Sequence, residues 1–195
     1  MSRETSLSVR RAVPGDAQGI ADVYVESWRE TYAGILPTSY LVKLSAERLS
    51  RQWRYRLSGA GRGRRGPYAI LVAETAEGLV VGFGESGPSR ESDLGYAGEI
   101  YTLYVAPDYL SLGVGRALLA ALFSAVVESG TNTALIWALT ANPSRHFYAA
   151  NGGRIVAERS SVYWGRQLRE IAYGWSDLEG WLSDASQPLS SGKDA

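Results

Sequence analysis

The chain has 195 residues, of which 45% are hydrophobic, so it can bury one sizeable core and is too short for two ordinary domains. Its 20 basic and 20 acidic residues cancel, so no overall field steers it toward nucleic acid or an anionic membrane. Because there is no cysteine and one histidine, His146, the composition excludes disulfide frameworks, thiol nucleophiles and nearly every zinc site built from His and Cys.

The beginning of the chain and its longest apolar run both argue against a membrane protein. Residues 1–11 are charged and hold no apolar stretch of the kind that a signal peptide contains. The run Ala117–Val127 is shorter than the roughly 20 residues that cross a bilayer. We therefore expect a cytoplasmic protein with no membrane and no nucleic-acid partner.

The first third of the chain predicts a strand followed by helices. Apolar and polar residues alternate over 7–11 before a Pro-Gly-Asp turn, as in a strand whose following aspartate caps a helix. Apolar side chains then recur every three or four residues over 17–32 and again over 40–57, which predicts two amphipathic helices. The Gly- and Arg-rich stretch 58–67 is typical of an exposed loop.

The rest of the chain predicts mainly strands. An antiparallel meander is expected first, then a crossover unit of strand, helix and strand, and finally a short helix and a hairpin. The predicted strands are 68–74, 79–85, 99–105, 134–139, 154–164 and 168–175, and the predicted helices are 116–129 and 143–150. The polar residues 186–195 are expected to be a disordered tail, so residues 1–185 form one predicted domain.

The most informative segment is a glycine-bearing loop that leaves strand 99–105 and opens a helix. Gly113 and Gly115 have no β-carbon, so backbone N–H groups there can surround a phosphate, and the helix amino terminus adds partial positive charge. A P-loop would need Lys and then Ser or Thr where Arg116 and Ala117 stand. A dinucleotide-binding loop would need its first glycine directly after the strand. The remaining interpretation is a pyrophosphate-binding loop of another kind.

This loop resembles the acyl-CoA-binding loop of the GNAT superfamily of N-acyltransferases, whose signature there is R or Q, x, x, G, x, G or A. Gly113 and Gly115 supply the glycines, and the preceding residues LYVAPDY are similar to the family's lead-in. Leu110 stands at the family's Arg or Gln position and Ser111 stands where a glycine is frequent. The resemblance therefore implies an acyl-CoA site with one polar pyrophosphate contact missing.

A second motif follows the next strand. Asn142, then Phe147 and Tyr148, then Gly152 are similar to the family's N, FY, G pattern, and the resemblance covers residues 7–175. It implies an α/β (α+β) domain with a mixed, mostly antiparallel twisted sheet of about seven strands, helices on both faces and splayed central strands. It also implies acetyl-CoA as co-substrate, with no metal. The implied cofactor contacts are Leu103, Val105, Leu110, Ser111, Gly113, Val114, Gly115, Arg116, Asn142 and Tyr148.

Acyl transfer to an amine suggests roles for particular residues. A lysine-like amine, with a pKa near 10.4, must lose a proton before it attacks a thioester, and we expect Glu99 at the start of the central strand to be the base. Glu85, at the end of the neighbouring predicted strand, is the second candidate for the base. The backbone N–H of Val105 is expected to stabilise the oxyanion, and Tyr148 is expected to donate to the departing thiolate.

The resemblance implies that the acceptor site lies at the first two helices and the loops at the open end of the sheet. Aromatic side chains there can hold an apolar or cationic amine. The candidate acceptor-binding residues are Trp28, Tyr32, Tyr40, Glu85, Tyr101, Tyr163 and Tyr173. The leading prediction is an N-acetyltransferase that acts on a small-molecule amine, such as an amino acid, a polyamine or an antibiotic-like amine. A protein amino-terminal or lysine acetyltransferase, a non-catalytic acyl-CoA-binding module and a homodimer stay open.

Overall fold

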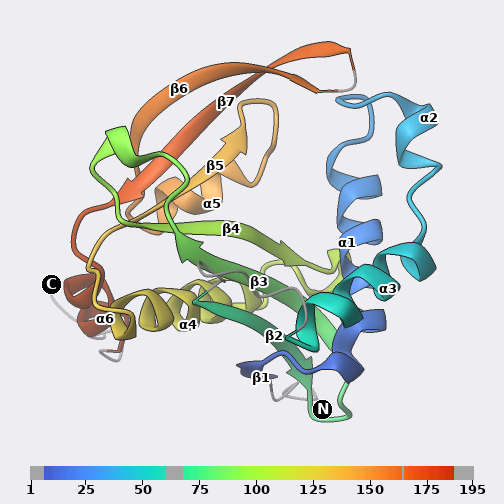
Figure 1. Cartoon of the computed structure of the whole chain (residues 1–195), viewed down its shortest axis with the longest axis horizontal. Helices are drawn as coiled ribbons and strands as arrows, with labels where there is room; N and C mark the ends of the chain where they lie inside the picture. The colour runs from blue at the N-terminus through green and yellow to red at the C-terminus, as the bar shows by residue number, and fades with distance from the viewer. Residues whose placement is uncertain (1–6, 60–67, 164, 187–195) are drawn as a thin grey trace, which may run out of the picture.

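The computed structural model describes residues 7–59, 68–163 and 165–186 (Figure 1). Most of the predicted loop 58–67 and of the predicted tail 186–195 lies outside these residues, as does Trp164 at the hairpin turn. No helix in the described ranges is long and apolar enough to span a membrane.

Within the described residues the strands form one seven-stranded sheet in the order β1-β2-β3-β4-β5-β7-β6. The strands are β1 (Leu7–Arg11), β2 (Ala69–Thr75), β3 (Val80–Pro88), β4 (Gly98–Val105), β5 (Ala134–Leu139), β6 (Arg154–Tyr163) and β7 (Arg166–Trp175). Neighbouring strands are antiparallel except β4 and β5, which are parallel. The predicted mixed and mostly antiparallel sheet is confirmed.

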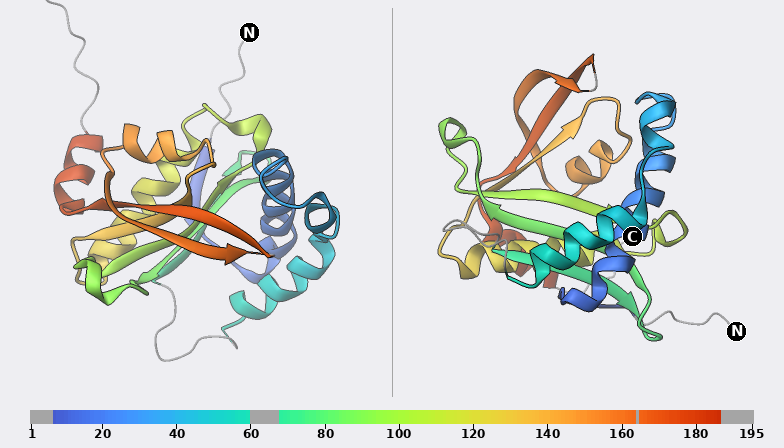
Figure 2. Two further views of the ribbon diagram at one scale, coloured as in Figure 1. Left: turned by 90° about the horizontal axis from the view of Figure 1, so that it is seen from above. Right: turned by 45° about the vertical axis from the view of Figure 1, so that its right-hand side comes forward.

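Helices cover both faces of the sheet (Figures 1 and 2). They are α1 (Ala17–Thr31), α2 (Thr38–Leu41), α3 (Ala46–Leu57), α4 (Val114–Glu128), α5 (Arg145–Ala150) and α6 (Leu178–Ser186). Phe83 of β3 packs with α1 and α3 residues on one face. The next residue, Gly84, faces α4, where an added β-carbon would lie 2.6 Å from a methyl group of Leu122. Glycine in β3 thus allows α4 to pack closely against the sheet.

One prediction about helices is wrong, and one helix was not predicted. The single helix 40–57 is split, because Ser45 accepts a hydrogen bond from the backbone N–H of Arg48 (3.3 Å) and caps a new helix, α3. Helix α6 was not predicted. It is anchored by Trp181, whose indole N–H donates to the carbonyl oxygen of Asn151 (2.8 Å), as the indole N–H of Trp175 also does (2.8 Å).

The central strands separate soon after they pair. Parallel pairing of β4 with β5 covers Gly98 with Ala134 and Glu99 with Leu135. Beyond these pairs β4 stays with β3, while β5 leaves with β7 and β6, and the two parts of the sheet diverge (Figure 1). The splayed central strands implied by the sequence motifs are therefore present.

The β6–β7 hairpin reaches from this divergent part of the sheet back to the segment between α1 and α2. Arg166 donates to the backbone carbonyl of Ile35 (3.0 Å). Leu168 of β7 packs with Tyr32 and Leu36 in a small apolar cluster. The tip of the hairpin and the α1–α2 segment thus close one side of the opening between β4 and β5 (Figures 1 and 2).

Candidate active site

The loop between β4 and α4 has the backbone geometry of an anion-binding concavity. Ser111 has a φ of 61°, Gly113 has a φ of 82°, and α4 begins at the next residue, Val114. Left-handed residues in such a turn bring successive N–H groups toward a common point, and the amino terminus of the 15-residue helix α4 adds partial positive charge. The structure therefore presents backbone donors where the sequence predicted a phosphate site.

A cavity of about 470 Å³ lies beside this loop, and we call it the loop cavity. Eight of the ten predicted cofactor contacts line it: Leu103, Val105, Leu110, Ser111, Gly113, Gly115, Arg116 and Tyr148. Val114 does not, because its side chain is buried in the core against the sheet. Asn142 does not either. Its amide nitrogen donates to the hydroxyl of Tyr32 (3.1 Å), and its amide oxygen accepts a hydrogen bond from the backbone N–H of Ser144 (2.8 Å).

The backbone of β4 offers polar groups to the opening between the central strands. Ala106 donates to the carbonyl of Val81, so in the antiparallel register the polar groups of Val105 and Leu103 point away from β3. Ser27 of α1 confirms this direction, because its hydroxyl donates to the Val105 carbonyl (3.0 Å). The N–H of Val105 therefore faces the opening, as the predicted oxyanion role requires.

A second cavity, of about 200 Å³, lies on the hairpin side, and we call it the aromatic cavity. Its walls include the predicted acceptor-binding residues Trp28, Tyr32, Tyr101 and Tyr163. Tyr40 packs against Trp28, with ring centroids 6.0 Å apart, and is not part of the wall. Tyr173 belongs to the core, with its ring 5.8 Å from that of Tyr148.

Both predicted carboxylate bases lie outside the two cavities. Glu99 is fully buried at the start of β4 and accepts hydrogen bonds from the backbone N–H and the guanidinium of Arg90. Glu85 is buried on β3 and paired with Arg56 of α3. Neither side chain lines the loop cavity or the aromatic cavity. The expectation that Glu99 or Glu85 acts as the base thus has no support in the geometry.

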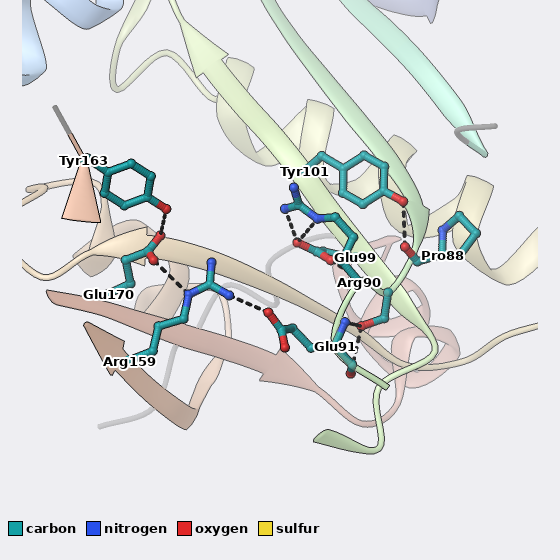
Figure 3. A network of polar contacts seen from close by, with 9 residues as sticks. Pro88, Arg90, Glu91, Glu99, Tyr101, Arg159, Tyr163 and Glu170 are labelled. Atoms are coloured by element: carbon teal, nitrogen blue, oxygen red, sulfur yellow. Dashed lines mark hydrogen bonds and ion pairs between the residues drawn. The ribbon is translucent and has the colours of Figure 1, made fainter. Parts of the chain in front are cut away.

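The carboxylate that does line the aromatic cavity is Glu170 of β7, which the sequence reasoning missed. It accepts hydrogen bonds from Arg159 (2.8 Å), Ser161 (2.9 Å) and the hydroxyl of Tyr163 (3.1 Å). Burial opposes its ionisation, but the hydrogen bonds from Arg159 and Ser161 outweigh burial and hold the pKa of Glu170 below its ordinary value. Figure 3 shows Arg159 between Glu170 and Glu91, with which it also pairs.

Tyr148 lies where the two cavities meet. Thr31, Leu103, Tyr104, Ser144 and Tyr148 line both of them. Burial raises the pKa of the Tyr148 hydroxyl, so the group keeps its proton at neutral pH. Tyr148 can therefore donate a hydrogen bond or a proton at the junction. His146 is exposed and lines neither cavity.

Thr102 and Trp137 also line the aromatic cavity and were missed by the sequence reasoning. In the described part of the chain, the hydroxyl of Thr102 and the indole N–H of Trp137 are buried without a hydrogen-bond partner. Among the same residues no group of three or more His, Cys, Asp or Glu side chains is placed to hold a metal ion.

Comparison with known proteins places the chain in a family. A model described as the Acetyltransferase (GNAT) family matches residues 22–152. The curated "Uncharacterized N-acetyltransferase YuaI" of Bacillus subtilis (strain 168) is 36% identical over 173 residues, which are 88% of this chain and 94% of that protein. The chain therefore belongs to the GNAT family of acetyltransferases, and it is an acyltransferase.

Solved structures share the fold. The PaiA N-acetyltransferase of Thermoplasma acidophilum, solved with coenzyme A, has a TM-score of 0.65 at 21% identity, covering 85% of this chain and 98% of that one. YncA of Salmonella typhimurium, solved with its cofactor acetyl-CoA, has a TM-score of 0.63 at 22% identity, covering 90% of this chain and 95% of that one. The fold class that the sequence motifs implied is confirmed.

Proposed function

We propose that the enzyme transfers an acetyl group from acetyl-CoA to the primary amine of a small molecule, by direct attack in a ternary complex. One observation carries this proposal: a cavity at a phosphate-type loop and a cavity lined by aromatic side chains meet at a protonated tyrosine, Tyr148. A donor and an acceptor that enter from opposite sides would react at that junction.

The loop cavity suits acetyl-CoA. Backbone N–H groups around Ser111 and Gly113 would hold the pyrophosphate, and the backbone groups of Leu103 and Val105 would bind the amides of the pantetheine arm. Arg116 adds a positive charge to the wall, and Asn151 orients it through a hydrogen bond (3.2 Å). Leu110, 56% exposed, gives an apolar contact where the family has Arg or Gln.

The chemistry follows from the groups at the junction. The neutral amine attacks the thioester carbonyl carbon, so that a C–N bond forms and the C–S bond breaks. The N–H of Val105 stabilises the oxyanion, and Tyr148 donates to the sulfur that leaves as thiolate. No His, Cys or Lys lines either cavity in the described residues, Glu30 of the loop cavity is exposed, and the lowered pKa of Glu170 makes it a weak base, so the proton of the amine leaves to solvent. The proposal makes no use of Glu99.

The contact between the β6–β7 hairpin and the α1–α2 segment argues for a small acceptor rather than a peptide. A bound peptide would need an open groove, whereas here the hairpin tip contacts the α1–α2 segment through Arg166 and Leu168. The aromatic cavity, at about 200 Å³, suits an amine of low molecular mass.

The proposal is tested by assaying release of the CoA thiol from acetyl-CoA with a panel of small amines and with peptides that carry free amino termini. Saturable release with small amines, and little with peptides, is the expected result. Release with peptides alone would establish a protein acetyltransferase, and acetyl-CoA binding without release would establish a binding module. Absence of acetyl-CoA binding would overturn the proposal.

A further inference from the structure

Glu170 gives the aromatic cavity a negative charge. It is the one charged side chain among the described residues that line this cavity. Its partner Arg159 does not neutralise the cluster, because Arg159 is shared with the carboxylate of Glu91 (Figure 3). Two carboxylates and one guanidinium leave a net charge of about −1 beside the cavity. The lowered pKa of Glu170 keeps that charge at neutral pH.

Aromatic rings line the same cavity as Glu170. The walls of the cavity include Trp28, Tyr32, Tyr101 and Tyr163 together with Trp137 of β5. The faces of such rings attract a cation. Arg159 already lies over the ring of Trp137 (4.0 Å) and Arg90 over that of Tyr101 (4.8 Å), so attraction of a further cation depends mainly on Trp28, Tyr32 and Tyr163 and on the buried carboxylate. The cavity therefore favours an acceptor that arrives as an ammonium ion and disfavours one that carries a carboxylate.

Two polar groups of the cavity wall call for a hydrogen-bonding ligand. The indole N–H of Trp137 can only donate, and it is buried without a partner in the described residues. The hydroxyl of Thr102, on β4, is also buried without a hydrogen-bond partner in the described residues. A buried donor without a partner carries a desolvation penalty, which an oxygen atom on the acceptor would remove. A purely alkyl amine would leave both groups unsatisfied.

From these observations we infer the substrate class: a small cationic amine that carries an uncharged, hydrogen-bond-accepting oxygen, such as an amino alcohol or an amino amide. Glu170 attracts the ammonium into the cavity, where the amine loses a proton to solvent before it attacks the thioester, and Trp137 and Thr102 bind the oxygen. Free amino acids are disfavoured by the net charge at Glu170, and alkyl amines and polyamines by the unpaired donors. This inference rests on the proposed function, because it assigns the aromatic cavity to the acceptor.

The test compares three amines of similar length and amine pKa: aminobutanol, pentylamine and γ-aminobutyrate. Their affinities for the CoA-loaded protein are measured by calorimetry, and their kcat/KM values by thiol release. Aminobutanol is expected to bind about tenfold more tightly than pentylamine, the effect of pairing a buried donor, and γ-aminobutyrate is expected to bind most weakly.

Variants separate the two parts of the inference. Thr102→Val and Trp137→Phe should each reduce the preference for aminobutanol over pentylamine to roughly twofold, because the contact with the oxygen is lost while the aromatic or aliphatic wall is kept. Glu170→Gln should weaken aminobutanol about tenfold and should narrow its advantage over γ-aminobutyrate. Glu158→Gln, which removes a hairpin carboxylate outside the cavity, is the matched control and should leave all three affinities unchanged. Melting temperatures show whether each variant is folded.

Several results would overturn the inference. They are equal affinity for aminobutanol and pentylamine, tighter binding of γ-aminobutyrate, and failure of all three amines to bind a protein that binds CoA. Unchanged ligand preference in folded Thr102→Val, Trp137→Phe and Glu170→Gln would also overturn it. Failure to bind CoA at all would instead contradict the proposed function, so the two failures are distinguishable.

Discussion

Tyr148 is the residue at which both cavities and the proposed chemistry meet. Its hydroxyl is buried and its pKa is raised, so it is a donor throughout the range in which the enzyme would work. Phe147, the preceding residue, packs against the start of α4 beside the proposed phosphate site, where a β-carbon added to Gly115 would lie 3.3 Å from its ring. Phe147 and Tyr148 thus connect the loop between β4 and α4 to the place where the two cavities meet.

Replacing Tyr148 by Phe should lower kcat by about 10²-fold, because the thiolate would leave without a donor. The Kd for acetyl-CoA should change little, because the remaining wall of the loop cavity is intact. Stopped assays of thiol release, together with calorimetry, measure the two quantities. Tyr55→Phe, at a position 60% exposed on α3, is the control. A Tyr148→Phe enzyme with unchanged kcat would remove this residue from the mechanism.

Local motifs predicted part of the site, and tertiary pairing determined the rest. Gly113 and Tyr148 were found because each belongs to a short pattern in which sequence neighbours make the geometry. Glu170 was missed because its position depends on the strand register that sets β7 between β5 and β6, opposite Leu139 and Arg159. The available signal was an acid directly before the apolar residues 171–175 of β7. Glu99 was favoured for its place on β4, yet Arg90 binds it outside both cavities.

At the scale of elements, the turn that leads into α1 is held by a partly buried ion pair. Arg10 of β1 donates to both carboxylate oxygens of Asp16 (2.8 and 2.9 Å), and the backbone N–H of Val13 donates to the same carboxylate (2.7 Å). The hydrogen bonds from Arg10, and secondarily from Val13, outweigh burial and lower the pKa of Asp16. Asp16, expected as a helix cap, thus connects the turn to β1.

This ion pair predicts a pH dependence of stability. Because the pKa of Asp16 is lower in the folded protein than in the unfolded chain, its stabilisation is present above the unfolded pKa, near 3.9, and is lost as the pH falls through the folded pKa. Asp16→Asn should lower the free energy of unfolding at pH 7 and flatten its decline in acid. Urea unfolding between pH 7 and pH 3 measures both. An equally steep decline in the variant would contradict the assignment.

Helix α6 was missed because its stability comes from contacts that the local sequence does not show. Trp181 reaches across to the ring of Phe123 in α4, with centroids 5.1 Å apart in a T-shaped arrangement, and also donates to Asn151. Arg116 of the loop cavity lies over the Trp181 ring at 5.3 Å. The helix therefore supports the end of α5 and the side chain that faces the proposed phosphate site.

Trp181→Ala should lower the free energy of unfolding by about 2 kcal/mol, less than for a fully buried tryptophan, because the ring is only half-buried. Tyr55→Ala, at an exposed position, should cost much less. Denaturant unfolding of the two variants measures the difference. Equal and small effects would show that α6 contributes little to the fold.

At the scale of the whole molecule, the divergence of β4 from β5 creates the two cavities. The loop between β4 and α4 and the start of α4 form much of the loop cavity, whereas α1, the hairpin and β5 form much of the aromatic cavity. Hydrophobic periodicity predicted most of these elements, because each buries one face on the sheet. How far the hairpin reaches over the opening could not be predicted, since contacts such as Arg166 with Ile35 join segments far apart in sequence.

The lining of both cavities predicts how turnover depends on pH. With no His, Cys or Lys in either wall of the described structure, and with Glu170 a weak base because its pKa is lowered, deprotonation of the acceptor is left to solvent. The kcat/KM for a lysine-like amine should therefore rise about tenfold per pH unit between pH 6 and pH 9, following the neutral fraction of an amine whose pKa is near 10.4. Rate profiles with amines of different pKa check this. A plateau at one pH for all amines would reveal a protein base.

The central claim, direct transfer between two ligands bound together at Tyr148, is tested most directly by initial rates over a grid of acetyl-CoA and amine concentrations. The chain has no cysteine to carry an acetyl group, and its cavities share a wall, so intersecting double-reciprocal lines are the predicted result. Parallel lines, which indicate an acetylated enzyme intermediate, would contradict the account.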